Sequence, residues 1–232
     1  MKRRQKQAVR DFIERSLITH YNSKSPISEQ YRTIRTNIQF SSADSEYRTM
    51  MVTSSGPGEG KSTTTANLAV VLSQQGKKVL LVDADLRKPT AHYTFRVSNA
   101  QGITNVLTKQ IPLTEGCRQT EVENLSVLPS GPIPPNPAEL LGSRMMKEMI
   151  KEALEAYDVV LFDTPPVLAV TDAQVLANIC DGVVLVVGSS VTEKEAALKS
   201  KELLEAAKAK LLGVVLNRKK MKKGQYYHYY GS

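Results

Sequence analysis

Short apolar runs alternate with helical patterns from residue 47 to residue 218. Several of these runs are apolar on both faces and rich in β-branched residues, which is typical of strands buried within a parallel sheet. The expected strands are YRTMMVTSS (47–55), KKVLLVDAD (77–85), LSVLP (125–129), YDVVLFDTP (157–165), DGVVLVVGS (181–189) and KLLGVVLNR (210–218). Strands that alternate with helices predict an α/β fold whose mostly parallel sheet has helices on both faces.

The segments between the runs carry signals for the ends of helices. We expect one helix near 61–75 that stops at Gly76, one near 137–156 with Asn136 as N-cap and Pro137 in its first position, and one near 192–209 opened by a capping box of Thr192 and Glu195.

A further helix is expected before the first strand, in SPISEQYRTIRTNIQF (25–40). Its apolar residues follow 4, 3, 4 spacing and form one stripe: Ile27, Tyr31, Ile34 and Ile38. Charged residues lie at three-residue steps on another face: Glu29, Arg32 and Arg35. The pattern alone favours a solvated face with an intrahelical ion pair worth about 0.2–0.5 kcal/mol.

Length and charge favour one domain with charged ends. At 232 residues and 41% hydrophobic content, the chain can build one sizeable core. Residues 1–10 and residues 217–232 each carry five basic side chains and no acidic one, which leaves a net charge of −2 on residues 11–216. This distribution argues against a dedicated nucleic-acid groove across the fold. The basic ends fit contacts with acidic partners or anionic lipid, or simple solvation.

The number of cysteines and the length of the apolar runs indicate in which cellular compartment the chain is expected. Cys117 and Cys180 are too few for a disulfide framework and have no metal-ligand spacing, so we expect a reducing cytosol. No apolar run approaches the roughly 18–20 residues that span a bilayer. The chain is therefore expected to be cytoplasmic, with any membrane association provided by a partner.

A glycine-rich segment, SSGPGEGKSTTT (54–65), follows a predicted strand and opens a predicted helix. In the P-loop pattern G-x-x-x-x-G-K-[ST], backbone N–H groups hold phosphate, the lysine reaches the outer phosphates and the hydroxyl binds Mg²⁺. Gly60, Lys61 and Ser62 fill the last three positions, but Ser55 stands where the first glycine belongs. We expect Gly56 and Gly58 to supply the unusual φ angles instead. The alternative is a chance glycine-rich turn.

Two further strands end in carboxylates. Asp83 and Asp85 close VLLVDAD, and Asp163 closes the apolar run of VVLFDTPP. In a parallel sheet these strand ends share an edge with the P-loop. Carboxylates suit Mg²⁺, and a second one beside the metal ligands can accept a proton from an attacking hydroxyl. The alternative role for the pair is a strand-end cap that binds loop amides.

The last residues concentrate tyrosines beside basic residues. The segment RKKMKK (218–223) precedes four of the nine tyrosines, which are Tyr226, Tyr227, Tyr229 and Tyr230. A last strand parallel to the P-loop strand delivers this tail to the same edge. Tyr226 lies nine residues beyond Asn217, an extended reach of about 30 Å. A tail tyrosine can therefore reach a nucleotide site, its own or a neighbour's.

Together these motifs resemble those of the bacterial protein-tyrosine kinases (BY-kinases) that control capsule and exopolysaccharide synthesis. The resemblance covers residues 26–230 and is carried, in order, by EQYRTIR, GPGEGKST, LLVDADLRKP, VVLFDTPP, SGPIPPNPAELL and the tyrosine-rich tail. It is closest to the cytosolic form of Gram-positive bacteria, which is made apart from its membrane activator. Deviant-Walker partitioning ATPases are also similar, but they carry lysine where this chain has Gly56.

The resemblance implies a P-loop NTPase-like kinase domain at 25–217, between a basic segment at 1–24 and a disordered, basic, tyrosine-rich tail at 218–232. It implies catalytic roles for Lys61, Asp83, Asp85 and Asp163, and Mg²⁺ ligands among Ser62, Asp83 and Asp163. The implied nucleotide-binding residues are Gly58, Glu59, Gly60, Lys61, Ser62, Thr63 and Asn217. Asn217 would contact the adenine, although it can equally be an ordinary turn residue. Glu29, Arg32 and Arg35 match a contact between subunits.

The function implied is an ATP-dependent protein-tyrosine kinase that phosphorylates its own tail tyrosines, in trans within a homo-oligomer. The implied partners are a transmembrane activator, a cognate protein-tyrosine phosphatase and other protein substrates, with no dedicated binding of nucleic acid. Two other interpretations remain open at this point. One is an ATP-driven positioning switch without kinase activity, and the other is a non-catalytic adaptor whose tail stacks on RNA.

Overall fold

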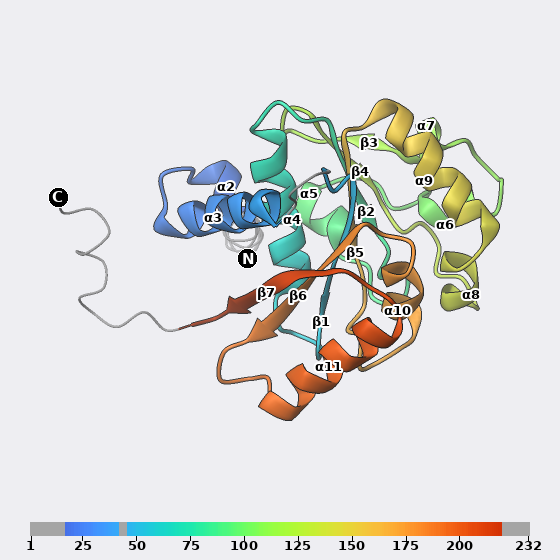
Figure 1. Cartoon of the computed structure of the whole chain (residues 1–232). Helices are drawn as coiled ribbons and strands as arrows, with labels where there is room; N and C mark the ends of the chain where they lie inside the picture. Colours follow the sequence, from blue (N-terminus) through green and yellow to red (C-terminus); the bar gives the residue numbers. More distant parts are fainter. Residues whose placement is uncertain (1–16, 42–45, 220–232) are drawn as a thin grey trace, which may run out of the picture.

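The sheet of this computed structural model, which describes residues 17–41 and 46–219, has seven strands within that part of the chain (Figure 1). The strands are β1 Thr49–Ser54, β2 Val79–Asp83, β3 Arg118–Gln119, β4 Leu125–Leu128, β5 Val159–Asp163, β6 Gly182–Gly188 and β7 Leu211–Asn217. Their order is β3-β4-β2-β5-β1-β6-β7, and only β3 pairs in the antiparallel sense. The predicted α/β class with a mostly parallel sheet is confirmed.

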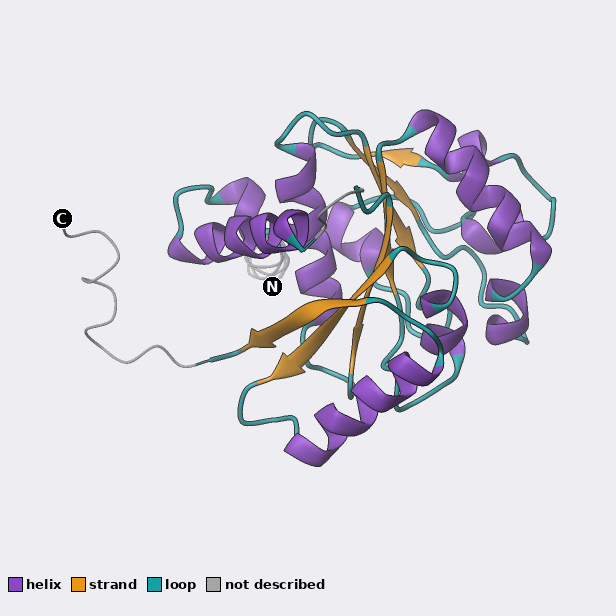
Figure 2. Ribbon diagram, in the orientation of Figure 1, coloured by secondary structure: helices purple, strands orange, loops and turns teal. Residues whose placement is uncertain are grey.

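Helices cover both faces of this sheet (Figure 2). One face carries α2 Ile18–Tyr21, α3 Pro26–Phe40, α4 Lys61–Ser73 and α5 Ala91–Phe95. The other face carries α6 Ile103–Leu107, α7 Leu113–Gly116, α8 Pro137–Leu141, α9 Arg144–Ala156, α10 Asp172–Ala177 and α11 Lys194–Ala206.

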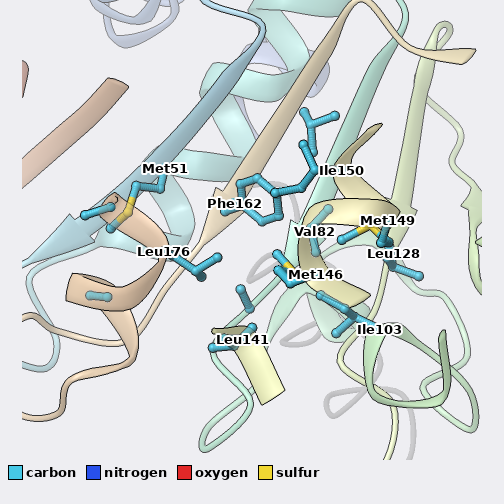
Figure 3. Packing of buried hydrophobic residues seen from close by; sticks show 14 of the residues in the cluster. Met51, Val82, Ile103, Leu128, Leu141, Met146, Met149, Ile150, Phe162 and Leu176 are labelled. Carbon is cyan, nitrogen blue, oxygen red and sulfur yellow. The ribbon is translucent and has the colours of Figure 1, made fainter. Parts of the chain in front are cut away.

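The core explains why the strand sequences are apolar on both faces. Every residue of β1, β2, β4 and β5 is buried, because helices pack above and below them. On one side, Phe162 of β5 packs with Met146 and Ile150 of α9 (Figure 3). The core therefore forms two layers that hold the central strands rigidly from both sides.

Polar side chains close the amino edge of the sheet. An Asp158 carboxylate oxygen accepts the N–H of Lys78 at 2.7 Å, just before β2. Asp181 accepts the N–H groups of Arg48 and Thr49 at 2.9 and 2.8 Å, just before β1. The Arg48 guanidinium also donates to the carbonyl of Leu154 at the end of α9, at 2.6 Å. These bonds satisfy backbone groups at the strand starts and fix where neighbouring strands begin.

Two of the expected helix boundaries were wrong. The helix expected at 137–156 is split into α8 and α9, because the Ser143 hydroxyl accepts the N–H of Met146 and starts a new helix. The helix expected from the Thr192 capping box begins at Lys194 with Glu193 as N-cap. The short helices α2, α5, α6, α7 and α10 were not predicted, since each is too brief to show a period.

The helix expected at 25–40 is present as α3, and Tyr31 and Ile38 of its apolar stripe are buried. Ile34 packs against the core partly buried, and Ile27, at the start of the helix, is 46% exposed. The apolar stripe therefore faces the core over most of the helix, with only its first position open to solvent.

The segment before α3 packs on the domain. Leu17 and Thr19 are fully buried, and the backbone N–H and hydroxyl of Thr19 both donate to the side-chain oxygen of Asn67 on α4, at 3.0 and 2.8 Å. Helix α2, which the sequence analysis placed in the basic N-terminal segment, therefore lies against α4. The rest of that segment and the tyrosine-rich tail fall outside the described residues.

β7 forms one edge of the sheet and is its least covered long strand. Val214 and Leu216 are 57% and 50% exposed. β7 pairs in parallel with β6, and β6 with β1, so the carboxyl end of β7 reaches the same edge as the end of β1. Among the described helices, none has the length and apolar character needed to cross a membrane.

An ion pair ties together two loops at the carboxyl edge. The Arg87 guanidinium, which follows β2, donates two hydrogen bonds of 3.0 Å to the carboxylate of Asp172, the first residue of α10. Asp172 is fully buried, whereas the Arg87 side chain is 42% exposed. A buried carboxylate needs such a partner, so Arg87 holds the loop after β2 against α10.

We predict that Arg87→Met lowers the free energy of unfolding by about 2–3 kcal/mol, because it leaves the Asp172 carboxylate buried without its charged partner. Urea denaturation followed by circular dichroism measures the change. The control is Arg144→Met, which removes an ion pair to Glu148 from an arginine side chain that is 91% exposed; its expected effect is below about 0.5 kcal/mol. Equal stabilities of Arg87→Met and wild-type protein would contradict the prediction.

Candidate active site

The glycine-rich loop joins β1 to α4, as a P-loop requires. Gly58 and Gly60 adopt positive φ angles of 74° and 94°, whereas Gly56, which we expected to share this role, does not. α4 begins at Lys61, so Lys61 and Ser62 occupy its first turn. Backbone N–H groups in that turn have no partner within the helix and face any bound anion. The chain thus forms a phosphate cradle of the expected type.

Asn217 lies against this cradle. Its side-chain amide donates to the carbonyl of Glu59 at 2.8 Å, and a Cβ atom at Gly60 would come within 2.0 Å of its nitrogen. Gly60 is therefore required both for its φ angle and for this close approach. The expected contact of Asn217 with an adenine remains a prediction, while its contact with the P-loop is a feature of the fold.

The carboxylates from β2 and β5 converge on the same loop. Asp83 and Asp163 are register partners on adjacent strands, and the end of β1 lies on the other side of β5. The Lys61 ammonium lies 2.9 Å from a carboxylate oxygen of Asp85 and 3.3 Å from one of Asp163. The Ser62 hydroxyl lies 3.2 Å from the same ammonium. The sequence prediction that these side chains share one edge is confirmed.

The bonds to loop amides that the sequence left open as an alternative are present at both Asp83 and Asp85, and their catalytic roles remain predictions. One Asp83 oxygen accepts the N–H groups of Thr90 and Ala91, both at 2.9 Å, and so caps the start of α5. The other oxygen is buried and has no hydrogen-bond partner. In Asp85, one oxygen accepts the N–H of Lys88 at 3.0 Å and the other faces Lys61. Each carboxylate is anchored by one oxygen and presents the other to the site.

The electrostatics of the site favour an added cation. Burial, and then repulsion from Asp163, raises the pKa of Asp83 to about 7. Burial also raises the pKa of Asp163, against the opposing effect of Lys61. For Lys61, burial is outweighed by the carboxylates of Asp163 and Asp85, so its pKa is raised. Burial thus opposes the charged forms of Asp83 and Asp163, and added positive charge near them would favour those forms.

The donor set fits Mg²⁺ bound together with a phosphate. Among the described residues, no three His, Cys, Asp or Glu side chains converge on one metal position, because Lys61 lies between Asp85 and Asp163. Mg²⁺ does not need such a cage, since it is usually held by one or two carboxylates, water and substrate phosphates. The unpartnered oxygen of Asp83, the Asp163 carboxylate and the Ser62 hydroxyl provide suitable oxygen donors.

Only part of the charged face of α3 is available for a contact with another subunit. Arg32 pairs with Glu29 on the surface and donates to the carbonyl of Ser23 at 2.7 Å. Arg35 instead turns inward and donates to the carbonyl of Val71 near the end of α4, at 2.7 Å. A role for the three residues between subunits remains a prediction. The four tail tyrosines, Tyr226, Tyr227, Tyr229 and Tyr230, lie outside the described residues.

Comparison with known proteins agrees with this geometry. The AAA domain family matches residues 47–209. The chain is 57% identical to the tyrosine-protein kinase YwqD of Bacillus subtilis, over 95% of this chain and 93% of the relative. It is 44% identical to the putative tyrosine-protein kinase CapB of Staphylococcus aureus, over 93% and 95% of the two chains.

Similarity to solved structures supports the same family. The crystal structure of the chimerical protein CapA2B2 has a TM-score of 0.86 and 49% identity, covering 89% of this chain and 91% of that chain. The septum site-determining protein MinD of Pyrococcus horikoshii has a TM-score of 0.63 and 29% identity, covering 74% and 70%. The P-loop NTPase-like fold is shared with both, whereas the high identity over nearly the whole length is to the kinases. The chain belongs to the BY-kinases and is a tyrosine-protein kinase.

Proposed function

We propose that this kinase uses ATP and Mg²⁺ to phosphorylate its own C-terminal tyrosines, in trans within a homo-oligomer, and so regulates the synthesis of a capsular or extracellular polysaccharide. One observation carries the proposal. The P-loop lysine faces carboxylates of two neighbouring strands at the same edge from which the tail emerges.

In this proposal, the backbone N–H groups of the P-loop, including those of Gly58, Gly60 and Thr63, bind the phosphates of ATP. Lys61 turns from Asp85 and Asp163 to the β- and γ-phosphates, because the phosphates then offer it a stronger negative partner. Ser62, Asp163 and the free oxygen of Asp83 would hold Mg²⁺. Bound there, Mg²⁺ would neutralise charge on the phosphates.

Transfer then requires one new bond and one broken bond. The phenolic oxygen of a tail tyrosine attacks the γ-phosphorus, the bond from that phosphorus to the β–γ bridging oxygen breaks, and ADP leaves. Asp85 accepts the phenolic proton once Lys61 has moved away, because the oxygen that Lys61 otherwise contacts is the one not bonded to the N–H of Lys88. Lys61 balances the charge that develops on the leaving phosphate.

The position of the tail supports its role as substrate. Asn217, the last residue of β7, contacts the P-loop directly, so the tail starts beside the phosphate cradle. A flexible coil of fifteen residues would span roughly 20 Å, enough to approach a nucleotide. A chain that leaves this edge must turn sharply back to reach its own γ-phosphate, whereas a neighbour's tail can enter directly. This geometry favours transfer in trans.

The names of the relatives support the proposed setting. One, from Klebsiella pneumoniae, is described as a putative tyrosine-protein kinase in cps region, and it is 37% identical over 65% of this chain. We infer by analogy that a transmembrane activator recruits this kinase to the membrane from the cytoplasm. A cognate phosphatase then removes the tail phosphates, and other proteins serve as further substrates.

The positioning switch without kinase activity, which the sequence alone left open, is set aside because the chain is a tyrosine-protein kinase. The likeness to MinD supports the shared fold. An antibody to phosphotyrosine after incubation with Mg²⁺-ATP measures whether phosphate reaches the chain's own tyrosines.

We predict that Lys61→Met abolishes tyrosine phosphorylation and ATP turnover, because methionine cannot balance the phosphate charge. The variant should still fold, since the lysine ammonium contacts only groups of the site. Phosphotyrosine blotting and ADP release measure activity, and circular dichroism checks the fold. Wild-type rates in folded Lys61→Met protein would refute the P-loop assignment.

We also predict that phosphate is transferred between chains. Lys61→Met protein with an intact tail is mixed with an active variant in which Tyr226, Tyr227, Tyr229 and Tyr230 are replaced by phenylalanine. The inactive chain should become labelled, as mass spectrometry of its tail peptide would reveal. An unlabelled inactive chain, with a wild-type rate per molecule that is independent of dilution, would show that each tail serves its own site.

The structure sharpens the prediction for α3. Replacement of Glu29 and Arg32 by alanine should lower the mass of the unphosphorylated oligomer in light scattering, because these side chains are on the surface. Replacement of Arg35 should lower the melting temperature instead, since it removes the bond to Val71. The control is alanine at Lys199 and Glu202, an exposed pair with the same spacing on α11. If the Glu29 and Arg32 replacements leave the oligomer mass unchanged, both residues belong to a solvated face and make no contact between subunits.

A further inference from the structure

The P-loop departs from its usual pattern at Ser55, and the structure shows what holds the loop there. The Ser55 hydroxyl is buried without a hydrogen-bond partner, so the serine side chain does not fix the turn. Its backbone N–H instead donates to a carboxylate oxygen of Glu59 at 2.9 Å. Glu59 lies four residues further along the same loop. The loop is therefore closed on itself by one side chain.

Glu59 is an unusual residue in a phosphate-binding loop, because its charge has the same sign as the ligand's. Its side chain is buried, and both of its oxygens are occupied. One oxygen accepts from Ser55, and the other accepts the hydroxyl of Thr192 at 2.5 Å. Two donors thus satisfy the buried side chain, one on each of its oxygens.

Thr192 is itself held in place. Its hydroxyl accepts the backbone N–H of Gly188 at 2.9 Å, at the end of β6. Because the Thr192 hydroxyl is already bonded to Glu59 and Gly188, it does not cap α11 as the predicted capping box required. Glu59 is therefore connected through one hydroxyl to the end of β6.

A second link closes a ring around the loop. The carbonyl of Glu59 accepts the side-chain amide of Asn217 at 2.8 Å, and the carbonyl of Asn217 accepts the N–H of Ser189 at 2.8 Å. The P-loop is thereby bound to the ends of β6 and β7 by both the side chain and the backbone of one residue. The ring contains no residue whose side chain faces Lys61.

We propose that Glu59 and Thr192 are positioning residues that preorganise the P-loop for ATP, in place of the missing first glycine. Their bonds fix the direction of the backbone N–H groups before the nucleotide arrives. A loop that is already in its binding shape loses less conformational freedom on binding, so the gain is expected in affinity for ATP. The inference rests on the proposed binding of ATP by this loop.

Other roles for Glu59 predict different behaviour. A general base or a metal ligand would use a carboxylate oxygen, and both oxygens of Glu59 already accept a hydrogen bond from the protein. A purely structural role would lower stability without changing the affinity of the molecules that remain folded. These three roles separate when KM for ATP, kcat and melting temperature are measured together.

The experiment uses the full chain with a tyrosine-kinase assay over a range of ATP concentrations, and a titration with fluorescent ADP. Thr192→Val keeps the shape and removes the hydroxyl, whereas Thr192→Ser keeps the hydroxyl. Glu59→Ala removes both bonds, whereas Glu59→Gln keeps an acceptor for Ser55. Glu193→Gln is the control, since it neutralises an exposed glutamate beside Thr192.

We expect Glu59→Ala and Thr192→Val to raise KM for ATP and Kd for ADP by about 10-fold, the equivalent of one hydrogen bond to a charged group. Glu59→Gln and Thr192→Ser should recover most of this loss, and the Glu59→Ala/Thr192→Val double variant should bind no more weakly than Glu59→Ala alone. The kcat at saturating ATP should change by less than about twofold, because the proposed catalytic side chains are intact.

Lower melting temperatures with unchanged KM and Kd would overturn the proposal in favour of a structural role. A large loss of kcat in Glu59→Gln, with normal Thr192→Val, would overturn it in favour of a base or a metal ligand. Lys61→Met serves as the reference for the site itself. Loss of labelling in Lys61→Met together with normal nucleotide affinity in the Glu59 and Thr192 variants would refute only the positioning role.

Discussion

The concentration of buried carboxyl groups at one edge of the sheet is the constraint on which the site depends. Asp83 and Asp163 end two adjacent strands, and Asp85 lies two residues beyond the end of β2; all three are buried. Burial raises the pKa of Asp83 and of Asp163. The Lys61 ammonium pairs with Asp85 and Asp163. In the proposed mechanism, a nucleotide that drew Lys61 away would leave these carboxylates to a divalent metal, and phosphate binding and metal binding would then be coupled through one side chain.

The layer formed by α2 and α3 extends this coupling toward the surface. α4 begins with Lys61. Further along this helix, the Thr19 hydroxyl donates to the side chain of Asn67, and the Arg35 guanidinium donates to the carbonyl of Val71. The proposed subunit contact on α3 is thus packed directly on the helix that opens the phosphate site. Rigid packing of this kind transmits small displacements. Assembly of subunits and the geometry of the P-loop then share one structural element.

Most of the fold and the heart of the site could be predicted from sequence, because both depend on local patterns. The strands were visible as β-branched runs, and Asp83, Asp85 and Asp163 were marked by their places at strand ends. The missed features depend on contacts between distant residues. Nothing local joins Arg87 to Asp172, and the capping pattern at Thr192 was equally consistent with a bond to Glu59. The same limit applies to Arg35, which faces α4 although its spacing matched the exposed charges of Glu29 and Arg32.

The open edge at β7 has a consequence for how the molecules behave in a crowded solution. Its outer side offers unpaired backbone groups together with the half-exposed Val214 and Leu216, and such an edge is a template for pairing with other chains. The segment RKKMKK begins one residue beyond this strand and brings five positive charges to it. Repulsion between such charges on two molecules would oppose pairing of their open edges. Each phosphate on the tail would cancel about 1.5–2 of them, so phosphorylation would alter the colloidal stability of the protein as well as its signalling state.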